Sequence, residues 1–404
     1  MDVSSPKPFP TREGPALDPD PLIPETVAGA GVQRIQPAYG RPCWVVARYD
    51  DVRVVLGDTR FVRHGTWAED ASRTTEINLL QPGTLNAMDG PKHARLRRFV
   101  SRTFTARRVD ALRPRAASVT QDLLDAVQHH GPPVDLVEAL ALPLPIRMIC
   151  ELLGVPAEDH AGFRAWTAGL MVEAAHDTAV LERALASWQN LQGYLLGLVE
   201  ARRSAPADDL LSAMTLENDA GDALTDDEIA TVSVGLLVGG FETTAHMIGK
   251  SLLWLFQHPD HLAALRADLG LVPTAVEELL RHIPLAGGVS LPFIASEDVE
   301  LPGAGARIEA GEYVMPALAG ANLDDAAFPC AAEVRLDRSP NPHVSFGYGA
   351  HYCLGAHLAR MEMQVAFDAL LRRFPRLELA VPAGDVPWKQ GSAVWGLAAL
   401  PVTF

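Results

Sequence analysis

A loop punctuated by glycines ends in a single cysteine in the C-terminal part of the sequence. It reads His343-Val344-Ser345-Phe346-Gly347-Tyr348-Gly349-Ala350-His351-Tyr352-Cys353-Leu354-Gly355, and a helical pattern runs from Leu354 to about Phe374. Gly347 and Gly349 permit positive φ angles and close backbone approach, so that amide N–H groups can point at the sulfur atom. The helix that follows presents the positive end of its dipole. Both effects favour a thiolate at Cys353.

A lone thiolate in this setting suits a metal that brings its own equatorial ligands, and haem is such a group. Two alternatives compete with this interpretation. A single cysteine is most often a small buried hydrophobic residue, but the glycine loop argues against that role here. Zinc held by His343, His351, Cys353 and His357 is the weaker alternative, because structural zinc sites usually show two close-spaced ligand pairs and this segment supplies one thiolate.

An acid and a hydroxyl stand side by side in an apolar helical pattern that runs from Ile229 to Leu252. The pattern is interrupted by Val238-Gly239-Gly240-Phe241-Glu242-Thr243-Thr244. Each mid-helix glycine costs about 1 kcal/mol relative to alanine, so the segment needs either space or a loosened hydrogen-bond ladder. Close helix packing, with a threonine bonded to a carbonyl one turn earlier, is the structural alternative. An acid here needs a partner or water, and an acid beside a hydroxyl is what proton delivery to dioxygen requires, so Glu242 favours the catalytic interpretation.

Two further pairs of residues have helical spacing. Glu278 and Arg281 are three apart, which supports an ion pair on one helix face. His93 and Arg97 are one turn apart, so they offer two cationic donors to a carboxylate. A solvated basic face is the alternative interpretation of the second pair.

The composition is that of a folded protein with a large core. Of the 404 residues, 48% are hydrophobic and 21% are charged, which excludes a disordered chain. The 34 basic and 50 acidic residues give a net charge of −16, which argues against a general affinity for nucleic acid or anionic membranes. The four cysteines share no C-x-x-C spacing, and no apolar run reaches about 18 residues, so we expect a protein of the reducing cytoplasm without a membrane anchor.

Hydrophobic spacing divides the chain into a helical middle and β-like flanks. Helical periodicity dominates from Pro91 to about Ile283. Short runs with β-branched residues lie before and after it, as at Trp44–Tyr49 and Val299–Leu301. We therefore predict a mainly α fold with small β-sheets, with an irregular, proline-rich arm over residues 1–30 and a single large domain over residues 31–404.

A basic cluster lies between Lys92 and Arg115, where nine basic residues accompany one acid in an acidic chain. A charge run is often only a solvated face. A cluster opposite in sign to the whole protein is better explained by the steering of a small acidic partner. The chain has no G-x-G-x-x-G after a strand and no cysteine cluster, so the sequence shows no flavin or iron–sulfur module of its own. The residues to which we assign docking are Arg98, Arg102, Arg107 and Arg108.

The cysteine loop resembles the F-G-x-G-x-H-x-C-x-G signature of the cytochromes P450 at every fixed position, and the resemblance spans nearly the whole chain. The chain looks most like the soluble bacterial members. The resemblance implies the cytochrome P450 fold, a haem b cofactor with Cys353 as the axial ligand of its iron, and monooxygenation with O2. It also implies roles for further residues: Phe346, Gly347 and Gly355 around the thiolate; Gly239 and Gly240 at an oxygen pocket; Thr243 and Glu242 in proton delivery; His93, Arg97 and His351 at the haem.

Glu278 and Arg281 resemble the family's scaffold pair, an E-x-x-R motif. Arg335 is our candidate for the third, basic member of that scaffold. Two departures from the family pattern stand out. Where many relatives have a propionate-binding arginine in the context Pro-Arg-x-Ala-x-Glu-Asp, this chain has Phe293, so one propionate must find another partner. The usual Ala-Asn-Arg-Asp is also changed, with Leu323 in place of its arginine.

We therefore expect a haem-thiolate monooxygenase that hydroxylates or epoxidises an apolar small molecule in secondary metabolism, for example in antibiotic biosynthesis. A ferredoxin, of the 2Fe–2S or a similar type, and its reductase would supply electrons. A peroxide-driven peroxygenase and a non-catalytic haem-containing binding module are the alternatives. We expect a monomer, without nucleic-acid or membrane partners. By position, the resemblance assigns small or aliphatic residues to the substrate pocket: Leu79, Leu80, Val238, Gly239, Val289, Ala393 and Val394.

Overall fold

The computed structural model describes residues 5–76, 78, 80–168, 178–216, 223–390, 392 and 394–404. The chain forms two compact units, each built from segments far apart in the sequence. The first unit contains residues 1–92 and 273–353, and the second contains residues 93–272 and 354–404. The single large domain stays a prediction, and each unit is described by itself.

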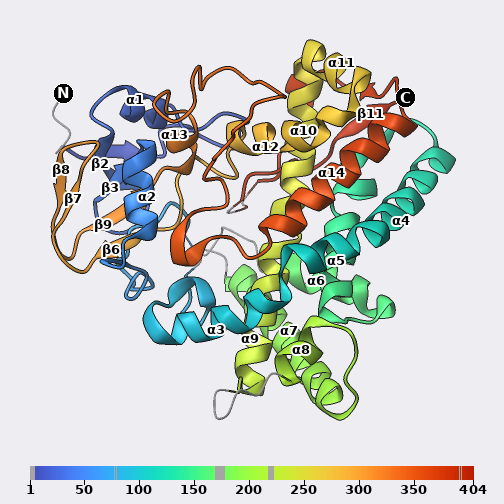
Figure 1. The fold of residues 1–404 in the computed structure, drawn as a ribbon, viewed down its shortest axis with the longest axis horizontal. Coiled ribbons are helices and arrows are strands. Elements are labelled where there is room, and N and C mark those ends of the chain that lie inside the picture. Colours follow the sequence, from blue (N-terminus) through green and yellow to red (C-terminus); the bar gives the residue numbers. More distant parts are fainter. Residues whose placement is uncertain are drawn as a thin grey trace. The chain divides into compact units, whose positions relative to one another are not determined.

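The first unit is built on a six-stranded sheet (Figure 1) with the strand order β1-β2-β3-β9-β6-β4. Neighbouring residues of β3 point to opposite faces, because Val45 and Val46 belong to two separate buried clusters. β4 pairs antiparallel with β6, with Val62 opposite Ile294. A separate hairpin is formed by β7 and β8. The strands of this unit are β1 (Lys7–Phe9), β2 (Val32–Pro37), β3 (Cys43–Val46), β4 (Phe61–Val62), β6 (Phe293–Ala295), β7 (Val299–Leu301), β8 (Ala306–Ile308) and β9 (Tyr313–Pro316).

Short helices accompany this sheet. The helix α2 packs its buried residues Val52, Val55 and Leu56 into the same cluster as Val46. The helices of the first unit are α1 (Leu22–Ala28), α2 (Tyr49–Gly57), η1 (Leu85–Ala87), almost all of α12 (Val272–His282), α13 (Leu318–Asn322) and η5 (Gly349–His351).

The prediction of an irregular arm over residues 1–30 is wrong within its described part, which contains β1 and α1. Proline is tolerated there because β1 is an edge strand, and because Pro21 and Pro24 lie at the amino end of α1, where a missing N–H costs little. The side chain of Ile23 is completely buried and anchors α1 on the sheet.

The second unit is mainly helical, as the periodicity predicts. The long helix α14 lies against α4, and α10 packs against α5 and α14 (Figure 1). A small sheet has the order β10-β11-β5. The helices are α3 (Gly90–Thr103), α4 (Ala106–His130), η2 (Val137–Ala141), α5 (Pro143–Leu153), η3 (Ala157–Asp159), α6 (His160–Ala168), α7 (Thr178–Ser204), α8 (Leu210–Leu216), α9 (Asp226–Gly240), α10 (Glu242–Gln257), α11 (Pro259–Ala267), η4 (Leu269–Leu271), α14 (Ala356–Arg373) and η6 (Ala383–Asp385), and the strands are β5 (Val134–Asp135), β10 (Glu378–Leu379) and β11 (Pro401–Thr403).

The predicted fold class, mainly α with small sheets, is confirmed by these elements. Within the described part of the chain, none of the helices combines the length and the apolar character that crossing a membrane requires.

Candidate functional site

The cysteine loop, residues 343–355, holds Cys353 by a short backbone contact. Its amide N–H donates to the carbonyl oxygen of Phe346 at 2.8 Å, and the thiol is exposed and free of any disulfide. Gly349 has a φ of +70°, and a Cβ atom there would lie 2.4 Å from the carbonyl oxygen of Leu56, so only glycine lets the loop approach α2 this closely. The backbone conformation of the loop that holds Cys353 therefore depends on its glycines.

The other cysteines differ from Cys353 in burial or in setting. Burial raises the pKa of Cys43 and of Cys150 to about 12, so both stay neutral thiols. Cys330 is exposed but lies outside the glycine loop. Cys353 is an exposed thiol three residues before the first residue of α14, and this donor fits the single axial ligand of a haem.

The zinc alternative has no support from the described part of the chain. No group of three or more His, Cys, Asp and Glu residues is arranged there to hold a metal ion. His343, one of the four supposed ligands, instead lies with its Nε2 atom 3.0 Å from Oε2 of Glu277.

Asn322 and α12 fix the start of the cysteine loop. The Asn322 amide is buried, accepts the backbone N–H of Val344 at 2.9 Å, and lies 2.8 Å from Oγ of Ser345. The Ser345 hydroxyl donates to the carbonyl oxygen of Leu280 in α12 at 2.6 Å. Asn322 belongs to the Ala-Asn-Leu-Asp segment that departs from the family pattern. The sequence analysis did not assign it a role.

The scaffold pair forms as predicted, but its third member is Arg338. Arg281 donates to both carboxylate oxygens of Glu278 at 2.8 Å, and both side chains are fully buried. Nε of Arg338 lies 3.0 and 3.1 Å from the same two oxygens. Burial raises the pKa of Glu278, but the bonds from Arg281, the Arg335 backbone and Arg338 outweigh it and hold this pKa below its ordinary value.

The prediction of Arg335 as the third side chain is therefore wrong. Its backbone N–H donates to Glu278 at 2.9 Å, whereas its side chain is half exposed and lies near Asp337. Both arginines occur in the same irregular stretch, where no periodicity decides which side chain turns inward.

Glu242, the acid predicted for proton delivery, has two partners that the sequence analysis did not identify. Its carboxylate forms an ion pair with the ammonium of Lys389, and Nε2 of His246 lies 3.4 Å away. The carboxylate is 2% exposed, but the Lys389 side chain is 38% exposed. Burial raises the pKa of Glu242, yet the bonds from His246 and Lys389 hold it below its ordinary value. Burial, with a smaller effect of the nearby lysines, holds the pKa of His246 below its ordinary value, although Glu242 opposes this.

A close backbone approach places Lys389. The backbone N–H of Lys389 donates to the carbonyl oxygen of Gly396 at 2.9 Å. A Cβ atom on Gly396 would lie 1.9 Å from Nδ1 of His246, so glycine is required where this segment passes α10. This approach brings Lys389 next to Glu242 on α10.

The predicted interruption of the apolar helix occurs at Phe241, between the end of α9 and the start of α10. The Thr243 hydroxyl donates to the carbonyl oxygen of Gly239 at 2.7 Å, which is the back-bonding of the structural alternative. Gly240 packs tightly on Ile149, since a Cβ atom there would lie 3.3 Å from its side chain. By contrast, Gly235 and Gly239 are exposed and one turn apart, and among the described residues no atom outside the local helix backbone lies within 4 Å of a Cβ position at either glycine.

The residues predicted to contact the haem are described within their own units. On the second, His93 is buried and Arg97 partly buried, one turn apart on α3. On the first, Nε2 of His351 lies 3.5 Å from Oδ1 of Asp89. Asp89 also accepts the backbone N–H groups of Arg63 and His64, each at 2.7 Å. Burial raises the pKa of Asp89, but His351 and these amides together hold it below its ordinary value.

The residues assigned to the substrate pocket are apolar and differ in burial. Leu80 is buried on the first unit, and Val289 packs at the edge of a core cluster there. On the second unit, Val238 is half-buried, and Val394 is 9% exposed. Leu79 and Ala393 lie outside the described residues. The pocket assignment stays a prediction.

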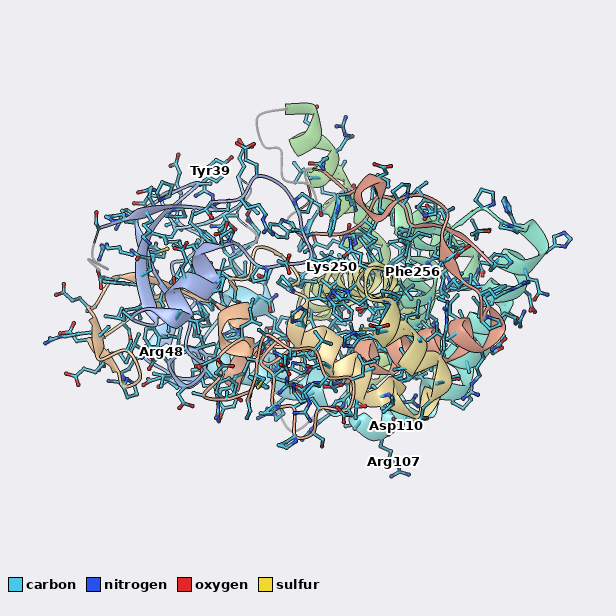
Figure 2. All side chains as sticks on the ribbon, turned by 90° about the horizontal axis from the view of Figure 1, so that it is seen from above. Tyr39, Arg48, Arg107, Asp110, Lys250 and Phe256 are labelled. Atoms are coloured by element: carbon cyan, nitrogen blue, oxygen red, sulfur yellow. The ribbon has the colours of Figure 1, made fainter. Side chains whose placement is uncertain are left out.

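The basic cluster occupies α3 and the first part of α4. Arg98, Arg102 and Arg107 are exposed, and Figure 2 shows Arg107 projecting from the protein surface. Arg108 forms an ion pair with Asp208 at 3.0 Å, so part of its charge is compensated. Arg108 is partly buried, so the exposed members of the docking set are Arg98, Arg102 and Arg107.

Comparisons with known proteins agree with these observations. Residues 178–391 match the family model described as cytochrome P450. The chain is 43% identical to nocardicin C N-oxygenase of Nocardia uniformis, over 98% of both chains, and 43% identical to mycinamicin IV hydroxylase/epoxidase of Micromonospora griseorubida, over 92% of both chains. The crystal structure of the LnmA cytochrome P450 hydroxylase from the leinamycin biosynthetic pathway of Streptomyces atroolivaceus superposes with a TM-score of 0.91, at 43% identity, covering 98% of this chain and all of that one. The chain therefore belongs to the cytochrome P450 family and is a monooxygenase with a haem cofactor.

Proposed function

We propose that this monooxygenase hydroxylates or epoxidises an apolar secondary metabolite, with Cys353 as the axial ligand of a haem b. The observation that carries the proposal is the buried Glu242 carboxylate, which lies next to Thr243 in the chain and is paired with the partly exposed Lys389. A bound haem supplies the activation of O2 and the electron transfer. The residues of the chain supply the ligand, the protons and the shape of the pocket.

Proton delivery is the task of Glu242, Lys389 and Thr243. Lys389 reaches solvent, so it exchanges protons with water and keeps the buried carboxylate of Glu242 charged. Glu242 passes protons inward, and Thr243 orients them with its hydroxyl. The back-bond from Thr243 to the carbonyl oxygen of Gly239 fixes the position of that hydroxyl.

Electrons come from an external ferredoxin, of the 2Fe–2S or a similar type. The exposed Arg98, Arg102 and Arg107 give a positive surface on a chain of net charge −16, which steers an acidic partner. We assign the protein to the cytoplasm as a monomer, which accords with four free cysteines.

The substrate class follows from the pocket and from the relatives. The residues at the predicted pocket positions are apolar, so they bind an apolar surface. The similar proteins act, by their names, on nocardicin C and mycinamicin IV, and a third serves leinamycin biosynthesis. We therefore propose the tailoring of an antibiotic-like natural product.

The test is turnover of a compound selected because it shifts the haem absorption of the wild-type protein. The reaction is run under ¹⁸O2 with NADH, a ferredoxin and its reductase, and in parallel with hydrogen peroxide alone. We expect a product that carries one ¹⁸O atom and needs the ferredoxin. Equal turnover with peroxide alone would establish the peroxygenase, and tight binding without product under either condition would establish the non-catalytic module.

A further inference from the structure

Arg63 is a buried cation with an unsatisfied donor. The residue follows β4 and is 5% exposed. Its Nη1 atom donates to the carbonyl oxygen of Pro292 at 2.8 Å, and its Nε atom is buried without a hydrogen-bond partner among the described residues. Burial lowers the pKa of Arg63 to about 9, although Asp89 opposes this. Buried arginines are normally paired with anions, so this side chain is prepared for an anionic partner that the described residues do not supply.

The position of Arg63 relative to Phe293 suggests which anion that is. The Cζ atom of Arg63 lies 3.6 Å from the centroid of the Phe293 ring. β4 and β6 are antiparallel, with Phe61 opposite Ala295 and Val62 opposite Ile294. The same register continued by one residue sets Arg63 opposite Phe293, and side chains that face each other across a pair of strands lie on the same face. The chain therefore has a cation, Arg63, directly after β4. It faces Phe293 on β6, which stands where many relatives have an arginine.

A second propionate-contact candidate, His351, borders the same ring. The ring centroids of Phe293 and His351 are 6.2 Å apart in an edge-to-face arrangement. His351 is a residue that we expect at the haem propionates. Asp89 links the two residues, because it contacts the His351 ring and accepts the backbone N–H of Arg63. The Arg63 guanidinium itself forms no ion pair with a carboxylate among the described residues.

We propose that Arg63 binds a haem propionate through its guanidinium and so takes over, from the neighbouring strand, the role of the cation that is absent at position 293. The propionate carboxylate would accept the unsatisfied Nε–H, and Phe293 would hold the guanidinium plane by stacking. The proposal rests on the presence of haem in the protein. Arg63 acts in holding the cofactor and not in the oxygen chemistry.

The test compares haem retention and propionate hydrogen bonding in the purified holoenzymes of wild type, Arg63→Met and Arg60→Met. Arg60 is the matched control, because it lies on the same segment but its partly exposed side chain pairs with Asp58. Haem retention is measured as the rate of transfer to an excess of apomyoglobin. Propionate hydrogen bonding is measured from the haem-propionate bending bands in the resonance Raman spectrum.

We expect haem transfer from Arg63→Met to be about 10- to 100-fold faster than from wild type, since a hydrogen bond between charged groups is lost. One propionate bending band should shift in that variant, and both measurements should stay unchanged in Arg60→Met. Equal transfer rates and unshifted bands in Arg63→Met would overturn the proposal.

A double variant keeps the test decisive if Arg63→Met takes up little haem. Arg63→Met/Phe293→Arg returns a cation to β6, and we expect it to regain haem retention and the propionate band. A double variant that holds haem no better than Arg63→Met would count against the proposal. A wild-type protein that binds no haem would contradict the haem assignment itself, which separates the two conclusions.

Discussion

The ammonium of Lys389 and the carboxylate of Glu242 form an ion pair that joins an almost completely buried acid to a side chain that reaches solvent. The pair holds the acid in its ionised form, because the bonds from Lys389 and His246 outweigh the effect of burial on its pKa. The proposed proton path uses this pair as its connection between the buried carboxylate and solvent.

Replacing Lys389 with methionine should raise the pKa of Glu242, because burial raises this pKa and only His246 would then remain to lower it. We expect product formation to fall roughly tenfold at neutral pH, and the acidic limb of its pH profile to move to higher pH. Glu242 has a lowered pKa in the folded state, so its stabilising contribution exists above the ordinary glutamate pKa and is lost as the pH falls through the lowered value. Product formation measured across pH tests this, with Lys389→Arg as the variant that keeps the cation. An unchanged profile in Lys389→Met would remove Lys389 from the proton path.

Replacing Thr243 with alanine should uncouple electron use from product formation. Without the hydroxyl that now bonds Gly239, protons reach the site through disordered water, and hydrogen peroxide is released. We expect NADH consumption to continue while the product yield per NADH falls several-fold. Peroxide and product are quantified in the same reaction, and Thr243→Ser, which retains a hydroxyl, is the control. Tight coupling in Thr243→Ala would contradict the role of this residue.

Replacing Cys353 with serine should remove the red-shifted Soret band that a thiolate-ligated haem shows with carbon monoxide after reduction by dithionite. Cys330→Ser is the matched control, since Cys330 is the other exposed cysteine. The control should keep the band of the wild type. Loss of the band in both variants, or in neither, would rule out Cys353 as the specific ligand.

Arg338 and Arg335 should differ strongly in their effect on stability. Arg338→Ala leaves the buried Glu278 with one partner fewer, so we expect the free energy of unfolding to fall by about 3–5 kcal/mol. Arg335→Ala removes a half-exposed side chain and should change it by about 0.5 kcal/mol or less. Denaturant unfolding of the two holoenzymes gives both values. Similar losses in the two variants would restore Arg335 as a member of the scaffold.

The pH dependence of the Arg338 effect has a defined sign. The pKa of Glu278 is lowered in the folded state, so its network stabilises the protein above the ordinary glutamate pKa. This stabilisation disappears as the pH falls through the lowered pKa. The difference between wild type and Arg338→Ala should therefore shrink on acidification, and unfolding measured at several pH values checks this.

Reversing the charge of Arg107 should slow reduction by ferredoxin. The side chain is exposed in the basic cluster, so Arg107→Glu weakens the attraction to an acidic partner, and we expect a rate about three- to tenfold lower at low salt. The difference should vanish at high salt, where charges are screened. Arg307→Glu makes the same charge change on β8 and serves as the control. Equal reduction rates in the two variants would place docking elsewhere.

Features that depend on residues close together in the chain could be predicted from the amino-acid sequence. The helical middle, the interruption between Gly240 and Glu242 and the Glu278–Arg281 pair all follow from spacings of one to four residues. Such spacings translate directly into helix faces and helix breaks, because the helical repeat fixes which neighbours meet. The cysteine loop could also be recognised from the sequence, because its motif residues are close together in the chain.

The partners of the buried charges could not be predicted in this way, because they lie far away in the sequence. Lys389 meets Glu242 across 147 residues, Arg338 meets Glu278 across 60, and Arg63 meets the carbonyl oxygen of Pro292 across 229. No local spacing specifies such contacts, because they depend on how strands pair and on where glycine lets the backbone come close. For this reason the sequence did not show that Arg338, and not Arg335, completes the scaffold. It also did not show that Arg63 lies opposite Phe293.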